Sequence, residues 1–289
     1  MMRTGAAALV AALLATTPVM TAVATRPAAA AEMPAVAFAV HGQAVTLDRA
    51  ALLARGDLTT VDIPDDVAYG RAMRYQAVPM AALMTEMGLK PDDHLEVAAL
   101  DGFVAQLPAA LLLEARPGRA RAFLAIEPAD APWPNLPGKD ADAGPFYMVW
   151  LNPQAGGVSA EQWPYQVARF TATVPLLERF PAMRVDAALP ADDPARAGEQ
   201  QFAVQCAACH TINGAGPAAV GPDLNLPMNP TEYLQAPALK MLIRDPKSVR
   251  SWGAAQMLGF SPEDLNDAEI DQVVAYLTHM AGRKQVPAR

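Results

Sequence analysis

The order of hydrophobic and polar residues separates a first part of the chain with short extended runs from a second part with helical spacing. Runs rich in apolar and β-branched residues predict strands at 36–40, 45–47, 95–100, 146–151 and 169–174, with a turn at His41-Gly42-Gln43. Helical apolar spacing predicts short helices at 47–55, 80–87 and 108–114. Residues 32–181 are therefore expected to form an α+β domain.

The second part shows start and stop signals for three helices. Asp193 followed by Pro194 is typical of a helix start, and residues 195–205 continue it. A middle helix is predicted at 238–244, and a last helix after the capping pair Asn266 and Glu269. We expect an all-α domain over residues 193–289, joined to the first domain by a short semi-rigid linker over 182–192.

The first 31 residues have the features of a secretion signal. Arg3 precedes an apolar run at 6–14, and small residues at 28–31 precede Glu32. The apolar run is interrupted at 16–18 and is too short for a membrane span. We therefore expect residues 1–31 to be removed, the mature chain to lack a transmembrane segment, and the protein to be periplasmic.

Composition limits the classes of partner. The 289 residues are 52% hydrophobic, enough for a buried core, and 30 acidic against 22 basic side chains give a formal net charge of −8. This charge argues against nucleic acid as a partner. The chain has 2 cysteines, so it can form at most one disulfide.

Both cysteines belong to the pentapeptide Cys206-Ala207-Ala208-Cys209-His210, which is the attachment pattern of haem c. Thiols three residues apart on one helical turn can each add to a vinyl group of the same porphyrin, and His210 then becomes the proximal iron ligand. The alternative is a redox-active or metal-binding Cys-x-x-Cys pair. The following histidine favours one covalently bound haem.

A methionine is the expected second axial ligand, because a thioether favours reduced iron and raises the potential. Met241 and Met280 lie in apolar helical patterns and are expected to be core residues. Met257 lies in an irregular stretch between two predicted helices, whereas Met228 lies in a proline-rich loop nearer to His210. We favour Met257 over Met228, since loops commonly carry such ligands.

Beyond the pentapeptide, the last hundred residues resemble a class I cytochrome c. Gly198, Phe202 and Tyr276 occupy positions where that family packs its first helix against its last. The resemblance implies a one-electron carrier with a class I cytochrome c fold.

The resemblance also extends to the haem surroundings. Gly221-Pro222-Asp223-Leu224 is similar to the family's Gly-Pro-x-Leu turn, in which the proline carbonyl orients the proximal imidazole. Trp252 and Met257 match the family's tryptophan and distal methionine, although Leu258 stands where the family usually has proline. The resemblance implies Cys206, Cys209, His210, Met257, Pro222, Leu224 and Trp252 as haem-binding residues, with His210 and Met257 on the iron.

Residues 32–181 resemble the molybdopterin-binding domain of the sulfite-oxidase type. The residues that carry this resemblance are 75–80, 101–103, 107–108, 123–126, 144–150 and 163–167. That family binds its metal through a cysteine in the region corresponding to 59–64, where this chain has none. Neither Asp62 nor Ile63 supplies a soft thiolate, so molybdopterin is not expected.

Three functional hypotheses follow. In the first, the chain is an electron-transfer protein rather than a catalytic subunit, and its first domain docks a soluble periplasmic redox protein or dehydrogenase. In the second, the first domain still binds a pterin or other cofactor and passes electrons to the haem, with His41, His94, Asp101 and Trp163 as the residues of interest. The simpler interpretation is a solvated or turn role for the two histidines, a turn role for Asp101 and a packing role for Trp163. In the third, the protein is an assembly or binding component with a structural haem.

Overall fold

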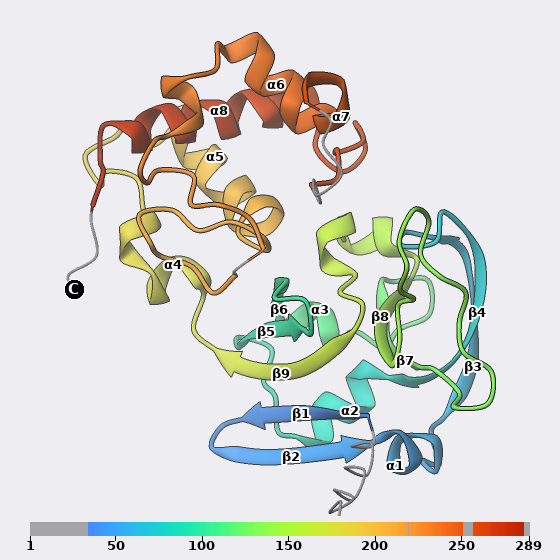
Figure 1. Cartoon of the computed structure of the whole chain (residues 1–289). Coiled ribbons are helices and arrows are strands. Elements are labelled where there is room, and N and C mark those ends of the chain that lie inside the picture. Colours follow the sequence, from blue (N-terminus) through green and yellow to red (C-terminus); the bar gives the residue numbers. More distant parts are fainter. Residues whose placement is uncertain (1–33, 219, 251–256, 286–289) are drawn as a thin grey trace, which may run out of the picture. The chain divides into compact units, whose positions relative to one another are not determined.

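All strands among the described residues lie in the first part of the chain, where they form two sheets (Figure 1). The computed structural model describes residues 34–218, 220–250 and 257–285. Met33–Arg289 make one unit by their internal contacts. The α+β character expected for the first part is confirmed.

The first sheet has the strand order β2-β1-β9-β5-β6. β1 (Ala35–Val40) and β2 (Gln43–Asp48) form the predicted hairpin, and its turn residues His41 and Gly42 have φ of 49° and 79°. Two positive φ values suit a tight hairpin turn between twisted strands. The other strands are β5 (His94–Ala99), β6 (Val104–Pro108) and β9 (Val167–Thr173), of which β9 runs parallel to β1 and antiparallel to β5.

The second sheet is antiparallel throughout, in the order β3-β4-β7-β8. Its strands are β3 (Thr59–Asp66), β4 (Arg71–Pro79), β7 (Arg121–Ile126) and β8 (Phe146–Leu151). Three short helices connect strands of this region, namely α1 (Arg49–Leu53), α2 (Met80–Glu86) and α3 (Ala109–Leu112).

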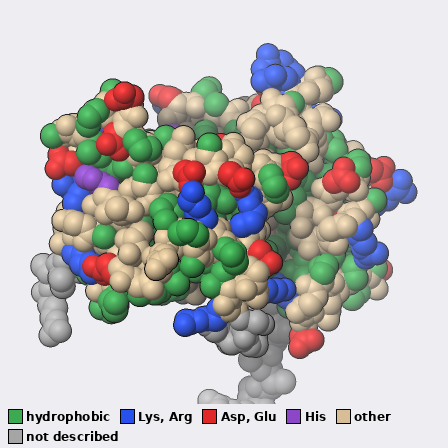
Figure 2. Space-filling model, turned by 90° about the horizontal axis from the view of Figure 1, so that it is seen from above, with side chains coloured by type: hydrophobic (Ala, Val, Ile, Leu, Met, Phe, Trp, Pro, Cys, Tyr) green, Lys and Arg blue, Asp and Glu red, His purple; other side chains and the backbone are tan. Residues whose placement is uncertain are grey.

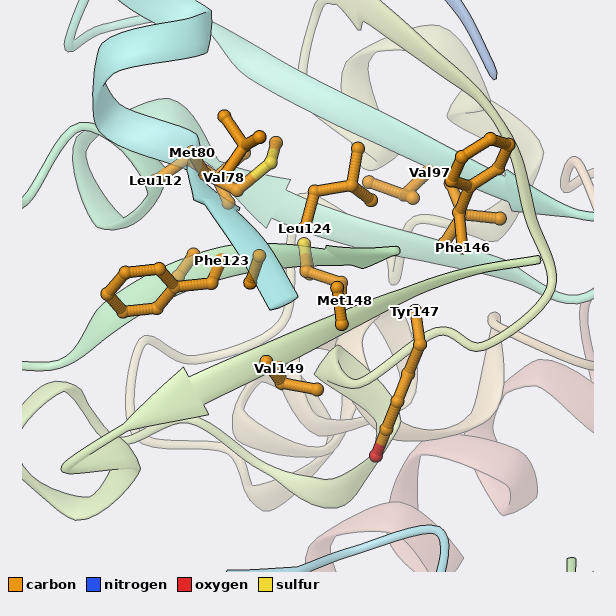
Figure 3. Close-up of a cluster of buried hydrophobic side chains, with 14 of the residues drawn as sticks. Val78, Met80, Val97, Leu112, Phe123, Leu124, Phe146, Tyr147, Met148 and Val149 are labelled. Carbon is orange, nitrogen blue, oxygen red and sulfur yellow. The ribbon is translucent and has the colours of Figure 1, made fainter. Parts of the chain in front are cut away.

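The core of the first part is built around β7 and β8, which are buried on both faces. Phe146 and Tyr147 are adjacent in sequence and lie on opposite sides of β8, and both are 0% exposed (Figure 3). Residues of β4, β5, α2 and α3 complete the cluster, among them Val78, Met80, Val97 and Leu112 (Figure 3). One apolar core therefore joins side chains from both sheets.

Differences from the predicted strands have identifiable causes. The run at 146–151 is observed as β8, whereas β3, β4, β6 and β7 were not predicted. β6 and β7 are almost continuously buried, so they lack the alternation that marks a half-exposed strand. β3 contains Pro64 and several aspartates, which disfavour a strand by propensity. The helix predicted at 108–114 is shorter, because Pro108 caps it from outside.

The second part is helical, and the three predicted helices are confirmed. They are α5 (Pro194–Gln201), continued by a π-helical turn (Phe202–Cys206), α6 (Ala236–Arg244) and α8 (Asp267–Ala281). The Asp193 carboxylate accepts a hydrogen bond from the Ala195 N–H at 2.9 Å, and Asn266 and Glu269 form the expected capping box. α4 (Leu176–Arg179) and α7 (Pro246–Val249) are two further short helices.

A glycine allows α5 and α8 to approach closely (Figure 1). A Cβ built on Gly198 would lie 1.9 Å from the Gln272 carbonyl oxygen of α8 and 2.8 Å from the Tyr276 Cβ. One turn further on, the rings of Phe202 and Tyr276 are 5.0 Å apart, centroid to centroid. The packing expected for Gly198, Phe202 and Tyr276 is confirmed.

The segment predicted as a linker packs against α8. Met183 is 0% and Val185 6% exposed, and the Tyr276 hydroxyl donates a hydrogen bond to the Met183 carbonyl oxygen at 2.6 Å. The Asp186 N–H donates to His279 Nε2 at 3.0 Å. Residues 183–186 therefore belong to the helical core, because their apolar side chains complete it.

Met241 was predicted to be a core residue, and this prediction is wrong. Its side chain is 52% exposed, whereas Met280 is 0% exposed as expected. On α6, Leu239 and Ile243 make the buried face, and Met241 lies between them in sequence and points outward.

We predict that Gly198→Ala destabilises the protein by about 3 kcal/mol, since the added methyl group must displace the α8 backbone. Gly282→Ala is the matched control, because a Cβ there would meet only the His279 carbonyl oxygen, at 3.6 Å. Denaturant unfolding followed by circular dichroism measures both free energies of unfolding. Equal stability of the two variants would contradict the close packing of α5 on α8.

Candidate functional site

The Cys-x-x-Cys-His pentapeptide begins at Cys206, which is the last residue of the π-helical turn that continues α5. The N–H groups of Cys209 and His210 both donate to the Cys206 carbonyl oxygen, at 3.1 Å and 2.9 Å. Both cysteines are free thiols and are partly exposed. The turn therefore presents two thiols and an imidazole from five consecutive residues, as the sequence predicted.

Both thiols are held in the protonated form. Burial, followed by the charge of Glu161, raises the pKa of Cys206 to about 12, and burial and the same carboxylate raise the pKa of Cys209 to about 12. A pair with such pKa values is a poor redox or metal-binding dithiol, because those roles need thiolate at neutral pH. The environment therefore argues against a reactive Cys-x-x-Cys pair.

The His210 ring is oriented by a backbone carbonyl. Its Nδ1 lies 2.8 Å from the Pro222 carbonyl oxygen, which can only accept, so Nδ1 carries the proton. Burial lowers the pKa of His210, which favours the neutral ring. The neutral ring with Nδ1–H keeps its Nε2 lone pair, and that is the protonation state that a metal-ligating histidine needs.

Gly221 makes this approach of ring and loop possible. A Cβ on Gly221 would lie 2.4 Å from His210 Cε1 and 2.5 Å from Nδ1. The Gly221 N–H also donates to the Cys209 carbonyl oxygen at 2.7 Å. The loop is thus hydrogen-bonded to the pentapeptide twice, through the Gly221 N–H and through the Pro222 carbonyl oxygen.

Asp223 shapes the turn that contains Pro222 and Leu224. One carboxylate oxygen accepts from the Thr211 hydroxyl at 2.9 Å and the Gly214 N–H at 2.6 Å. The other accepts from the N–H groups of Asn225 and Leu226, at 2.8 Å and 2.7 Å. Leu224 is partly buried against the helical core, and its role as a haem-binding residue stays a prediction.

Three buried asparagines hold the same loop against the end of α8. Asn225 Nδ2 donates to Asn213 Oδ1 at 2.7 Å and to the Met280 carbonyl oxygen at 2.8 Å. Asn229 Nδ2 donates to Asn225 Oδ1 at 2.9 Å and to the Leu277 carbonyl oxygen at 3.0 Å. This network was not predicted from the sequence, because its members are far apart along the chain and asparagine is common in loops.

Met257, the proposed distal ligand, directly follows residues 251–256, which lie outside the described residues. Met257 is 37% exposed, and the residues after it are fixed to α6, where the Phe260 N–H donates to the Ile243 carbonyl oxygen at 3.3 Å. Met228 is 53% exposed and Met280 fully buried. Trp252 lies outside the described residues. The assignment of Met257 as an iron ligand stays a prediction.

The four residues of interest in the first part have local roles. His41 Nε2 lies 2.8 Å from Asp93 Oδ2, and Asp101 Oδ1 accepts from the Phe103 N–H at 3.0 Å, which is a turn contact. Trp163 is 5% exposed and packs in the core, as expected. His94 is not a turn residue, since it begins β5, and its Nδ1 is buried without a hydrogen-bond partner among the described residues.

The region 59–64, where the resemblance would require a cysteine, lies in a strand. In β3, Asp62 is exposed and pairs with Arg74, while Ile63 is 1% exposed in the core. The adjacent buried Asp66 accepts from the hydroxyls of Tyr75 and Tyr147, at 2.8 Å and 3.2 Å, and burial raises the pKa of Asp66. Asp66 also accepts from the N–H groups of Ala68 and Tyr69, which stabilises the β3–β4 turn, and this buried carboxylate has no local signature in the sequence.

The donor set of the second part fits haem c. It offers two protonated thiols on one turn and a neutral imidazole whose Nδ1 is already occupied by a carbonyl. Over the ranges that the structure describes, no group of three or more His, Cys, Asp or Glu side chains is placed to hold a metal ion. Within the same ranges, no helix is long and apolar enough to cross a membrane.

We predict that Asn225→Ala lowers the free energy of unfolding by about 3 kcal/mol, because it removes the buried hydrogen bonds of the Asn225 side chain to Asn213, Asn229 and the Met280 carbonyl oxygen. Asn135→Ala, at an exposed position, is the control and should change stability by less than about 0.5 kcal/mol. Thermal unfolding of both variants checks this. A loss of stability in the control alone would contradict the role assigned to the network.

Comparison with known proteins agrees with this geometry for one part of the chain. A family model for cytochrome c matches residues 195–281. No curated protein matches the chain, and no family match supports the resemblance of residues 32–181 to the sulfite-oxidase type. The match covers the pentapeptide, the Pro222 turn and the closing helix α8. The C-terminal part of the chain is thus supported as a cytochrome c domain, which implies haem c and electron transfer.

Proposed function

We propose that the protein is an exported monohaem c-type cytochrome that carries one electron at a time between soluble redox partners. The observation that carries this proposal is the hydrogen bond from His210 Nδ1 to the Pro222 carbonyl oxygen, beside two free thiols on one turn. It leaves Nε2 as the metal-binding atom and holds the ring in one orientation.

Each residue of the site has a distinct task in this proposal. Cys206 and Cys209 would hold the porphyrin through thioether bonds, and His210 and Met257 would bind its iron. The group supplies the one-electron couple of its iron when it is bound. Gly221 and Pro222 fix the imidazole, and Leu224 and Trp252 provide apolar surroundings that limit access of water.

Export and partner class belong to the same proposal. The apolar and small residues of 1–31 favour removal of a signal and a periplasmic mature protein. The face shown in Figure 2 mixes acidic and basic side chains, with hydrophobic side chains between them. A surface of mixed sign suits transient contact with a soluble protein better than binding to a polyanion.

The first part is proposed to dock a redox protein or dehydrogenase rather than to catalyse a reaction. β3 offers Asp62 and Ile63 where the sulfite-oxidase type has a thiolate, and the only cysteines are those of the pentapeptide. Without a soft ligand the region has no evident means of holding molybdenum. The Val104 N–H of this part donates a hydrogen bond to the Ala208 carbonyl oxygen in the pentapeptide, and this contact supports a role close to the haem.

We predict that Met257→Ala retains covalent haem but loses the sulfur-to-iron absorption band and has a lower reduction potential, since a thioether ligand favours reduced iron. Met228→Ala is the matched control, because this exposed methionine is the rejected candidate. Optical spectroscopy and potentiometry of both purified proteins test the assignment. Loss of the band in Met228→Ala, with Met257→Ala unchanged, would exchange the two roles.

A further inference from the structure

The haem-attachment turn packs against an edge strand of the first sheet. β6 is the last strand of that sheet, yet Val104, Ala105, Gln106 and Leu107 are all buried. The Val104 N–H, at the unpaired edge, donates to the Ala208 carbonyl oxygen within the pentapeptide at 3.0 Å. β6 also contacts a 3₁₀ turn at Ala160–Gln162 and the π-helical turn that ends at Cys206. An edge strand is thus covered by the segment that binds haem.

Asp264 links the two turns that lie on β6. Its carboxylate oxygen Oδ1 accepts from the Ala160 N–H at 3.3 Å, and its carbonyl oxygen accepts from Gln205 Nε2 at 3.2 Å. Ala160 precedes Glu161 and Gln205 precedes Cys206. Asp264 therefore joins two positions in one network. One is the backbone next to Glu161, and the other is Gln205, which precedes the first haem-binding cysteine.

Glu161, like Asp264, has no cationic partner among the described residues. It is partly buried, and burial, with the neighbouring negative charge of Asp264, raises its pKa to about 7. After burial, its own charge is the largest influence on the thiols of Cys206 and Cys209. The other charges that act on Cys209 are those of Asp101 and Lys139.

We propose that Glu161 couples proton binding to electron transfer at the haem that Cys206 and Cys209 hold. This inference rests on the proposed function. Glu161 takes up a proton from water on a carboxylate oxygen when a one-electron donor protein reduces the haem, and releases it to water when an acceptor takes the electron. The charge is balanced, because each electron that the haem gains is accompanied by the uptake of up to one proton at Glu161.

The direction of coupling follows from electrostatics. A negative charge that acts on Cys206 and Cys209 would stabilise ferric iron in a haem held by these cysteines, because ferric iron has one more positive charge than ferrous iron. Deprotonation of Glu161 would therefore lower the reduction potential. By linkage, reduction raises the affinity of Glu161 for the proton. Thioether formation removes the two thiols from the titration, so Glu161 and Asp264 are the acids of this network that remain.

The test is potentiometric titration of the purified holoprotein between about pH 6 and about pH 8, the range in which a carboxyl raised to neutral pKa titrates. The wild-type midpoint is expected to fall as pH rises. In Glu161→Gln the midpoint should be higher than in the wild type at the upper end of the range, and the part of the pH dependence centred near neutrality should be lost. In Asp264→Asn the inflection should move to lower pH, because the carboxyl loses a negative neighbour.

Glu178→Gln is the control. It makes the same change at an exposed carboxyl of α4, whose charge is not among those that act on the thiols. Its titration curve should match the wild type. An unchanged pH dependence in Glu161→Gln, or an equal loss in both variants, would overturn the proposal.

The two proposals fail in different ways. Absorption spectra of the same samples report whether haem is bound with unchanged axial ligands, independently of pH dependence. A holoprotein with normal spectra and a midpoint that does not depend on Glu161 contradicts the coupling alone. A purified protein without a haem spectrum contradicts the proposed function itself.

Discussion

The hydrogen bond between His210 and the Pro222 carbonyl is the contact on which the proposed chemistry depends. It fixes the tautomer, the ring orientation and the basicity of the one nitrogen left for iron. The loop that supplies the carbonyl has little regular structure of its own. Its position comes from the Asp223 turn contacts and from the chain of buried asparagines that ends on α8. The orientation of one imidazole thus rests on the packing of the closing helix.

That packing in turn depends on small and aromatic residues at the crossing of α5 and α8. Gly198 lets the backbones approach, and Phe202 and Tyr276 fill the space beside them. α5 leads without interruption into the turn that contains Cys206. α5 therefore positions the thiols and α8 positions the imidazole loop, so a change in the crossing of the two helices would alter both together.

Local signals predicted those features that depend on neighbours in the sequence. Caps at Asp193 and Asn266, the spacing of Cys206, Cys209 and His210, and the hairpin at His41 and Gly42 all involve residues within five positions of each other. Features set by distant residues were missed or wrong. β6 is covered at its edge by the helical part, the linker residues Met183 and Val185 are buried by α8, and Met241 is exposed because its neighbours already complete the buried face. Within the site, the asparagine network has no local signature, and Glu161 could not be connected to the cysteines because 45 residues separate it from Cys206.

The covalent capture of one porphyrin by Cys206 and Cys209 is the central claim, and intact-mass measurement of the protein purified from an exporting host tests it most directly. We expect a mass equal to that of the polypeptide plus one haem, and the addition should persist under denaturing conditions, because thioether bonds do not dissociate. A mass equal to the polypeptide alone, from a host that matures other c-type cytochromes, would contradict the account.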